Sequence, residues 1–241
     1  MSAGRTPYGL EIIQSCLACP VQEESLFCRL GPEALRELNA IRQTSVYPKG
    51  ALLFVEGQPC RGLFVLCSGH AKLTASSPRG RSVIVRIARA GEVLGLSAVI
   101  SNTPYEVSAE TLVPAEANFL PREGFLRFLQ NNGEVSVRVA HYLSVELQRA
   151  YNQVVRIALA PTARAKFAGL LLDWAEREGQ PATKGTRFQL RLTHEEIGEL
   201  IGSTRETVTR LFNDFRRRGL IKTNGTLVSV PDQGKLKAFL S

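Results

Sequence analysis

Several features of enzymes and membrane proteins are missing from this 241-residue sequence. It contains no glycine-rich phosphate loop, no nucleophile elbow and no paired metal-binding histidine motif. Of its three histidines, His70 and His141 have no cysteine or acidic partner at metal-ligand spacing, and His194 begins an expected helix, where it is solvated or approaches a phosphate. No apolar run is long enough to span a bilayer, and the N-terminus lacks the apolar core of a signal peptide. We therefore expect a cytoplasmic protein that is not an enzyme and has no membrane partner.

The sequence has fewer acidic residues (22 Asp and Glu) than basic ones (30 Lys and Arg). The formal net charge is +8, and residues 161–241 hold 14 Lys and Arg against 9 Asp and Glu. A basic surface attracts phosphate without regard to sequence, and the attraction weakens steeply with salt. The composition favours a nucleic-acid partner, although modest positive charge also occurs in proteins that never bind nucleic acid.

The segment 203–212 separates polar and apolar residues onto two faces of one predicted helix. At roughly 100° per residue, one arc carries Arg205, Glu206, Thr209 and Arg210. The opposite arc carries Val208, Leu211, Phe212 and Phe215. Arginine pairs bidentately with guanine in the DNA major groove, and glutamate accepts from cytosine N4. The pattern is equally that of a solvated amphipathic helix with a Glu206–Arg210 pair, so the flanking sequence has to decide.

The sequence before this helix predicts a shorter one. Thr193 and Glu196 form a capping-box pattern, which indicates a helix with Ile197, Leu200 and Ile201 facing inward. Gly202 then permits a tight turn, and Ser203 or Thr204 caps the second helix. Two helices joined in this way are typical of a helix-turn-helix, with the second helix reading DNA. We expect Ser203 and Thr204, at the start of that helix, to lie at the DNA together with the exposed arc.

A β-hairpin is predicted after the second helix. The β-rich runs 219–222 and 227–230 flank Thr223–Thr226, whose Asn-Gly pair is a strong hairpin signal. A hairpin at this place would be the wing of a winged helix-turn-helix. The run Arg216–Arg218 suits the helix C-terminus electrostatically and is also placed to touch phosphates, and the two interpretations are equally favoured.

The N-terminal half has a different pattern. From about Val46 to Phe119, short β-rich runs alternate with glycines, which predicts a small β-sandwich or barrel. The helical stretch from Glu134 to Leu159 follows, with apolar residues at alternating three- and four-residue steps: Ala140, Leu143, Leu147, Ala150, Val154 and Ile157. Such a seam packs either on its own domain or, as we favour, on a second copy. Pro161 ends the helix.

In this order, the elements resemble the Crp/Fnr family of the cyclic-AMP receptor protein and the fumarate-nitrate reductase regulator over nearly the whole chain. The resemblance rests on Gly50, Glu56-Gly57, Gly69 and Gly91-Glu92-Val93-Leu94-Gly95, and on Ile197-Gly198, Gly202 and the run from Arg205 to Arg210. It implies an α+β chain with four parts: a cysteine-containing arm (1–29), a cyclic-nucleotide-binding-like β-roll or jelly roll (30–130), a long dimerisation helix (131–160) and a winged helix-turn-helix (161–241).

The resemblance also implies function. It assigns base contacts to Arg205, Glu206 and Arg210, and an inverted repeat with TGTGA-like half-sites as the target. We expect double-stranded DNA, a second copy of the chain and RNA polymerase as partners of a transcription regulator. The alternative is a redox or ligand-binding protein whose winged domain mainly contacts protein.

Two positions in the roll depart from the relatives that bind cyclic AMP. In those relatives a glutamate holds the ribose and an arginine holds the cyclic phosphate. Here the two positions read Leu96 and Val107, the latter ahead of Ser108. A phosphate buried without a cation is severely unfavourable. We therefore expect cyclic AMP to bind weakly or not at all.

The cysteines suggest another signal. Cys16 and Cys19 form a C-x-x-C and Cys28 follows, which resembles in part the cluster-binding cysteines of the oxygen-sensing relatives. Their fourth cysteine falls here near Asn118, so Cys60 or Cys67 would have to complete a four-thiolate iron–sulfur site. Zinc, a thiol redox switch and vestigial cysteines are the alternatives. Cys67 lies in an apolar run and is most simply a core residue.

Overall fold

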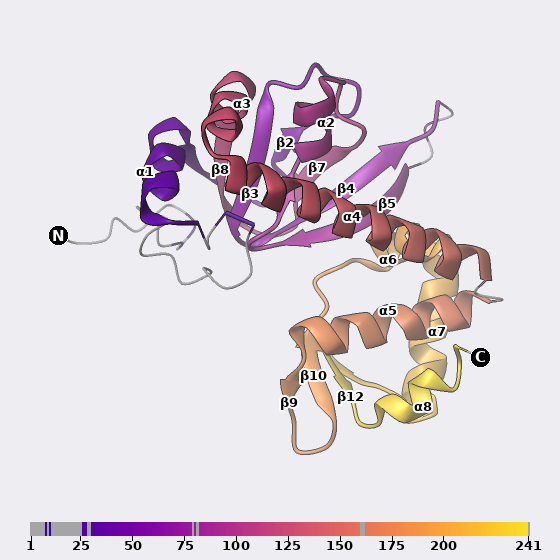
Figure 1. The fold of residues 1–241 in the computed structure, drawn as a ribbon. Coiled ribbons are helices and arrows are strands. Elements are labelled where there is room, and N and C mark those ends of the chain that lie inside the picture. The colour runs from indigo at the N-terminus through magenta and orange to yellow at the C-terminus, as the bar shows by residue number, and fades with distance from the viewer. Residues whose placement is uncertain are drawn as a thin grey trace. The chain divides into compact units, whose positions relative to one another are not determined.

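The computed structural model describes residues 8, 10, 26, 27, 30–78, 80, 82–159 and 162–240 (Figure 1). The chain divides into two units, Met1–Leu147 and Gln148–Ser241. Among the helices of the described part, none is both long and apolar enough to cross a membrane.

Two four-stranded antiparallel sheets form the β-roll of the first unit. One sheet has the spatial order β1 (Gln43–Tyr47), β8 (Ala115–Pro121), β3 (Gly62–Ser68) and β6 (Val93–Leu94). The other has the order β2 (Leu52–Phe54), β7 (Ser108–Thr111), β4 (His70–Ser76) and β5 (Ser82–Arg89). Strands β1 and β8 are distant in sequence, yet they pair with Gln43 opposite Phe119. The β-rich runs of the sequence thus form the expected roll.

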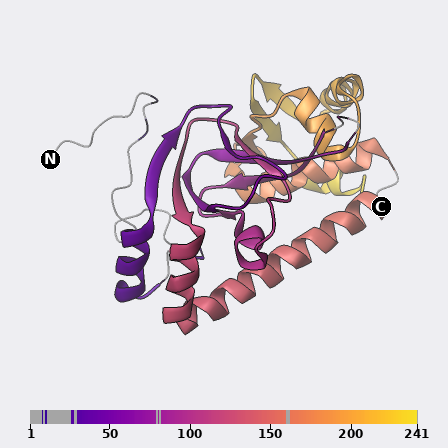
Figure 2. The ribbon, with the colours of Figure 1, turned by 90° about the horizontal axis from the view of Figure 1, so that it is seen from above.

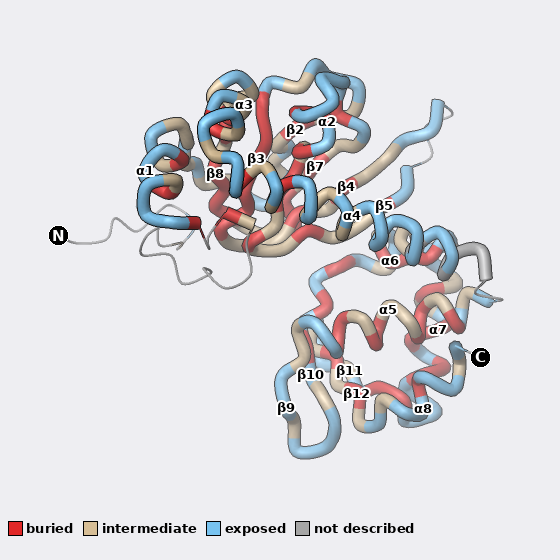
Figure 3. Tube along the Cα trace, in the orientation of Figure 1, coloured by how far each residue is buried: buried red, intermediate tan, exposed pale blue. Residues whose placement is uncertain are grey.

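Side chains alternate along β3 between two apolar cores. Phe64 and Leu66 join residues of β4, β7 and β8 in a core between the sheets. Leu63 and Val65 point to the other face, where the core includes residues of the helices α1 (Pro32–Ile41), α2 (Leu96–Ser101), α3 (Arg122–Asn131) and α4 (Gly133–Leu159). Figure 2 shows α1 and α3 side by side, and Figure 3 shows the buried residues gathered inside the roll. The period of two along the strand explains how one strand serves both cores.

The helix α4 has two different faces. Val135 and Val139 are buried in the core beside the roll. Further along, Leu147 is 54% exposed and Val154 is 63% exposed. The first part of the helix, including the seam residue Leu143, is therefore anchored to the roll, whereas Leu147 and Val154 of the predicted seam are exposed.

A cluster of charged side chains joins the roll to α4. Arg86 of β5 forms ion pairs with Glu92, which precedes β6, and with Glu146 of α4 (3.4 Å). Tyr142 lies beside them and accepts a hydrogen bond at its hydroxyl from the backbone N–H of Val93 (3.2 Å). The two carboxylates raise the pKa of Arg86, against the desolvation that is the largest single influence and would lower it. The guanidinium thus stays charged inside this junction.

The second unit combines helices with a third antiparallel sheet. Its helices are α5 (Ala163–Glu178), α6 (His194–Ile201), α7 (Arg205–Arg217) and α8 (Gln233–Lys237). Its sheet has the order β11 (Lys222–Asn224), β12 (Leu227–Val230), β10 (Thr186–Gln189) and β9 (Gln180–Pro181). The rings of Phe167 on α5 and Phe215 on α7 lie 5.2 Å apart, and both are fully buried. This aromatic contact fixes α7 on the domain core.

Candidate nucleic-acid interface

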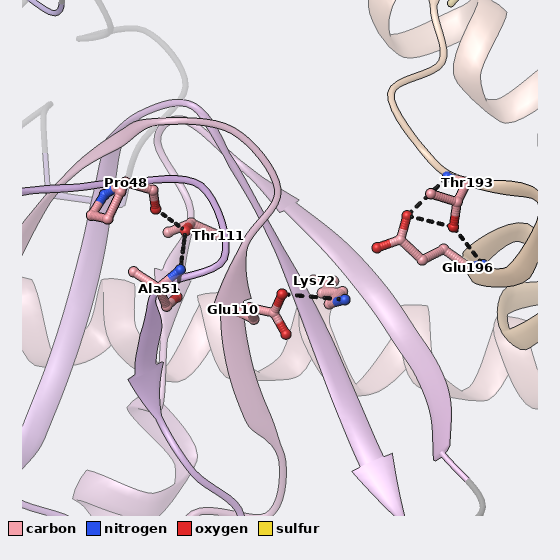
Figure 4. Close-up of polar contacts among 7 residues, drawn as sticks. All are labelled: Pro48, Ala51, Lys72, Glu110, Thr111, Thr193 and Glu196. Atoms are coloured by element: carbon pink, nitrogen blue, oxygen red, sulfur yellow. Dashed lines mark hydrogen bonds and ion pairs between the residues drawn. The ribbon is translucent and has the colours of Figure 1, made fainter. Parts of the chain in front are cut away.

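The capping box predicted for α6 is present. The Glu196 N–H donates to Thr193 Oγ1 (3.2 Å), and the Thr193 N–H donates to the Glu196 carboxylate (2.8 Å; Figure 4). Ile197 and Ile201 are buried as expected, and Leu200 is half-buried. The helix begins and ends where the local sequence dictates.

The turn between the helices follows from Gly202. Its φ of +64° lies in the left-handed region, which glycine adopts without a steric penalty. Thr204, rather than Ser203, caps α7: its side chain accepts from the Thr207 N–H (3.3 Å). The expected inward face of α7 is buried, from Val208 at 0% exposure to Phe215 at 0%.

The exposed arc of α7 presents two cations and one anion. Arg205, Glu206 and Arg210 are all exposed, and Arg210 Nη2 donates to Thr207 Oγ1 (3.2 Å). Hydrogen bonds from its own backbone N–H and from Thr204 lower the pKa of Glu206, and both arginines lower it further. Glu206 is therefore a carboxylate that only accepts hydrogen bonds at neutral pH.

Thr209 differs from the expectation that it belongs to this open arc. It is half-buried, and its hydroxyl donates to the Arg205 carbonyl (3.0 Å) and lies 2.8 Å from His194 Nδ1. The His194 ring in turn stacks on Phe212, with centroids 4.8 Å apart and planes at 12°. Helical angles alone could not show this, because His194 is contributed by α6.

The arginine run at the end of α7 is divided in its contacts. Arg217 and Arg218 donate to Asp214 at 3.1 and 2.9 Å, and Arg164 of α5 lies 3.4 Å from the same carboxylate. Arg216 contacts the neutral side chain of Asn213 instead. Burial alone would raise the pKa of Asp214, but the hydrogen bonds from Arg218 and Arg217 lower it. Arg217 and Arg218 therefore have a structural role at the end of the helix. Arg216 is exposed and contacts only a neutral side chain among the contacts described above.

The wing is the expected hairpin: β12 matches the predicted run 227–230, whereas the first strand is 222–224 instead of 219–222. Asn224 pairs with Leu227, so the two-residue turn is Gly225–Thr226 and β11 extends through Asn224. The sheet gains β10, which pairs with β12 and gave no sequence signal.

The wing, the loop before α6 and α7 enclose a pocket of about 370 Å³. Four buried side chains line its apolar part: Leu190, Leu192, Phe212 and Val228. His194, Arg216 and the wing residues 223–226 complete it. The pocket escaped sequence reasoning because residues more than 30 positions apart form it.

In the roll, the two positions that depart from the cyclic-AMP receptors are apolar in their contacts as well. Leu96 is 3% exposed inside the core beside the helices, and Val107 packs on the core between the sheets. The Ser108 hydroxyl already accepts a hydrogen bond from the Glu56 N–H (2.9 Å). Tyr105 is buried, donates to the Gly62 carbonyl (2.6 Å) and stacks on Phe54 (4.2 Å). Leu96 and Tyr105 are thus buried, and Val107 is half-buried against the same core.

Other polar groups of the roll also have partners inside it. Thr111 Oγ1 donates to the Pro48 carbonyl (2.6 Å) and accepts from the Ala51 N–H (2.9 Å; Figure 4). Lys72 lies 3.4 Å from Glu110, with only 17% of the lysine side chain exposed. Lys72 is therefore paired within the sheet.

Of the five cysteines, Cys16, Cys19 and Cys28 lie outside the described residues. Cys67 is a buried core residue, as expected, and its sulfur accepts from Asn118 Nδ2 (3.0 Å). Cys60 is half-buried and donates to the Gly62 carbonyl (3.5 Å). Within the described part, no three His, Cys, Asp or Glu side chains converge as a metal site.

Two protein families match the two units of the chain. Residues 44–132 match the cyclic nucleotide-binding domain, and residues 165–239 match the Crp-like helix-turn-helix domain. The first range covers the roll, and the second covers α6, α7 and the wing.

Curated relatives match over most of their length. The chain is 28% identical over 211 residues to the "CRP-like cAMP-activated global transcriptional regulator" of Mycobacterium tuberculosis, which covers 88% of this chain and 94% of the relative. It is 27% identical over 225 residues to the "Transcriptional activator protein anr" of Pseudomonas aeruginosa, covering 93% and 91%. These relatives are transcription regulators.

Solved structures share the fold. FixK2 from Bradyrhizobium japonicum superposes with a TM-score of 0.74 at 19% identity, over 83% of this chain and 98% of the other. The c-di-GMP responsive global regulator CLP of Xanthomonas campestris gives a TM-score of 0.73 at 21% identity, over 84% and 100%. With a cyclic nucleotide-binding-type roll, a Crp-like reading domain and these relatives, the chain belongs to the Crp/Fnr family of DNA-binding transcription regulators.

Proposed function

We propose that this protein binds, as a homodimer, an inverted repeat with TGTGA-like half-sites and reads it through Arg205, Glu206 and Arg210. The observation that carries the proposal is the division of α7 into a buried face and an exposed arc of these three side chains. A helix fixed on its core by aromatic contacts can present such an arc to the major groove without reordering.

The chemistry of the three side chains suits a G·C-containing half-site. Each guanidinium can donate two hydrogen bonds to guanine O6 and N7, and the Glu206 carboxylate can accept from cytosine N4. Arg210 uses one nitrogen for Thr207, which leaves its other donors for a base. Ser203 and Thr204, at the start of α7, are proposed to lie along the backbone, and Thr209 is proposed to support the arc through its contact with His194.

The direct test measures binding to a 30-base-pair duplex that carries the inverted repeat and to a scrambled duplex of the same composition. We expect Arg205→Ala to lose the preference for the repeat, by about 1–3 kcal/mol per half-site, and to keep weak non-specific affinity. Lys237→Ala removes the same charge from exposed α8 and should keep the preference. Wild-type protein that prefers no sequence would contradict the proposal. A genome-wide footprint with and without oxygen would then identify the natural sites.

The second copy is proposed to pair along α4, through the helix of residues 131–160. The exposed apolar side chains Leu147, Tyr151 and Val154 follow one another at three- and four-residue steps. Exposed apolar stripes of this kind are typical of coiled-coil seams.

Glutamate at position 147 should break this pairing, because two charges would face each other in the seam. We expect Leu147→Glu to shift the protein from dimer to monomer in sedimentation equilibrium. Asn152→Glu adds the same charge on the opposite side of the exposed helix and should remain dimeric. A monomeric wild type would contradict the proposal.

We propose further that the signal enters through the N-terminal half and is not cyclic AMP. The apolar packing of Leu96, Val107 and Tyr105 supports this, because neither Leu96 nor Val107 can offer a charge to a nucleotide. The mycobacterial relative is named as cyclic-AMP-activated, so calorimetry of this protein with cyclic AMP is the direct test. Cys16, Cys19, Cys28 and Cys60 remain the candidates for an iron–sulfur, zinc or thiol sensor. Iron, sulfide and zinc analysis after anaerobic purification separates these alternatives.

RNA polymerase is the proposed protein partner through which bound regulator changes transcription, in keeping with its transcription-regulator relatives. Co-sedimentation with polymerase on the inverted-repeat duplex would test it.

A further inference from the structure

The pocket between the wing and α7 contains an unusual balance of charge. Among its lining residues, His194 is titratable, Arg216 is a fixed cation, and there is no carboxylate. Arg216 is exposed and donates to the neutral side chain of Asn213. The pocket therefore suits an anion, and its apolar part can accept the sugar next to it.

His194 is held in a defined orientation at this place. Its Nδ1 lies 2.8 Å from Thr209 Oγ1, and its ring stacks on Phe212. Thr209 has one hydroxyl proton, which it donates to the Arg205 carbonyl (3.0 Å). The proton between His194 and Thr209 must then belong to Nδ1, so that Nε2 of the neutral ring is an unprotonated acceptor.

We propose that His194 contacts a backbone phosphate of bound DNA as an imidazolium, so that each subunit takes up one proton at Nε2 when the complex forms. The inference rests on the proposed function only in that α7 enters the DNA groove. The imidazolium Nε2–H would donate to the phosphate while Nδ1–H keeps its bond to Thr209. The added proton comes from solvent, and no bond other than N–H is made.

The charges around His194 oppose its protonation in the free protein. Burial lowers the pKa of His194, and Arg205 and Arg216 of α7 lower it further. On its own helix, the Glu196 carboxylate is bonded to Thr193 and Glu195 is exposed, while the pocket residues of the wing carry no titratable group. A phosphate offsets both guanidinium groups and raises the pKa. Duplex affinity should thus rise as pH falls through the window between the free and bound pKa values.

The experiment measures duplex affinity from pH 8 to pH 6 by fluorescence anisotropy, on the inverted-repeat duplex and on its scrambled counterpart. Wild-type affinity should increase by at least about tenfold more than that of His194→Gln, because each proton taken up contributes tenfold per pH unit while the pH lies between the free and bound pKa values. His194→Arg carries a permanent cation and should bind at pH 8 as wild type does at pH 6, without the pH dependence. His141→Gln, exposed on α4, should keep the wild-type pH profile.

Two further readouts separate the inference from its alternatives. At pH 6, the logarithmic salt dependence for His194→Gln should be shallower by about 0.9 per subunit, which a purely structural role would not produce. Calorimetry in two buffers of different ionisation enthalpy counts the protons directly. Equal pH profiles for wild type and His194→Gln, or zero proton uptake, would overturn the inference. Because a phosphate contact is independent of sequence, the scrambled duplex tests it even if the inverted repeat is not preferred.

Discussion

The roll and the exposed arc of α7 place their charged side chains in opposite ways. In the roll, Arg86 and Lys72 are paired with carboxylates of neighbouring elements, and Leu96 and Val107, where the resemblance leads us to expect nucleotide contacts, are apolar. On α7, Arg205 and Arg210 are exposed and face no carboxylate of another element in the described structure. A cation that is satisfied internally cannot also recognise an anion at low cost, so the reading domain is prepared for a charged partner and the roll is not.

The largest expected effect comes from breaking the support of the exposed arc. Phe215→Ala deletes a fully buried ring that contacts Phe167, and we expect it to destabilise the second unit by about 3–5 kcal/mol. Thermal unfolding should show loss of this unit's transition and DNA binding should disappear with it. Asn213→Ala, exposed on the same helix, is the control. Unchanged unfolding of Phe215→Ala would mean that the contact with α5 does not hold the helix.

Arg86→Gln removes the ion pairs that Arg86 forms with Glu92 and Glu146. The substitution removes the guanidinium that Glu92 and Glu146 share, so the first unit should lose about 2–3 kcal/mol. The matched control is Arg138→Gln, which removes an exposed pair with Glu134 and should cost at most about 0.5 kcal/mol. Chemical denaturation that gives the same loss for both would contradict the difference between the buried and exposed pairs.

Adding a cation at position 107 of the roll tests whether the apolar residue there is what distinguishes the roll from α7. Val107→Arg places a guanidinium beside Ser108, and we expect cyclic AMP affinity to rise by about ten- to one-hundredfold from a wild-type value too weak for routine calorimetry. Val107→Lys, with the same charge and no bidentate fork, should gain less. Micromolar binding to the wild type would show that backbone amides suffice for the phosphate.

The smallest effect concerns acid stability of the reading domain. The pKa of Asp214 is lowered in the folded state, so its pairing contributes stability above its ordinary value, near pH 4, and this is lost as the pH falls through the folded-state pKa. Asp214→Asn should therefore lower the melting temperature at pH 7. The difference in melting temperature between this variant and the wild type should become smaller toward pH 2–3. A difference that is constant with pH would show that hydrogen bonding, and not charge, makes the contribution.

The sequence predicted the parts of the fold that local patterns decide. The Thr193 capping box, the Gly202 turn and the two faces of α7 follow from neighbouring residues within one or two helical turns. The long helix is also as expected, because its apolar spacing and the proline after it are local signals.

What the sequence could not show depends on residues that are distant in the chain. Arg164 and Asp214 meet across two helices, and Thr209 is turned inward by His194. The strand β10 is four residues long and exists because β12 pairs with it. For the same reason, the pocket beside the wing had no signature in any single segment.

The pairing of β1 with β8 has a consequence for the order in which the protein is made. The first unit is complete once the first part of α4 has been synthesised, since Val135 and Val139 close its core. A nascent chain can therefore fold its roll, and expose the seam of α4 to a neighbouring nascent chain on the same messenger RNA, before the DNA-reading half has left the ribosome.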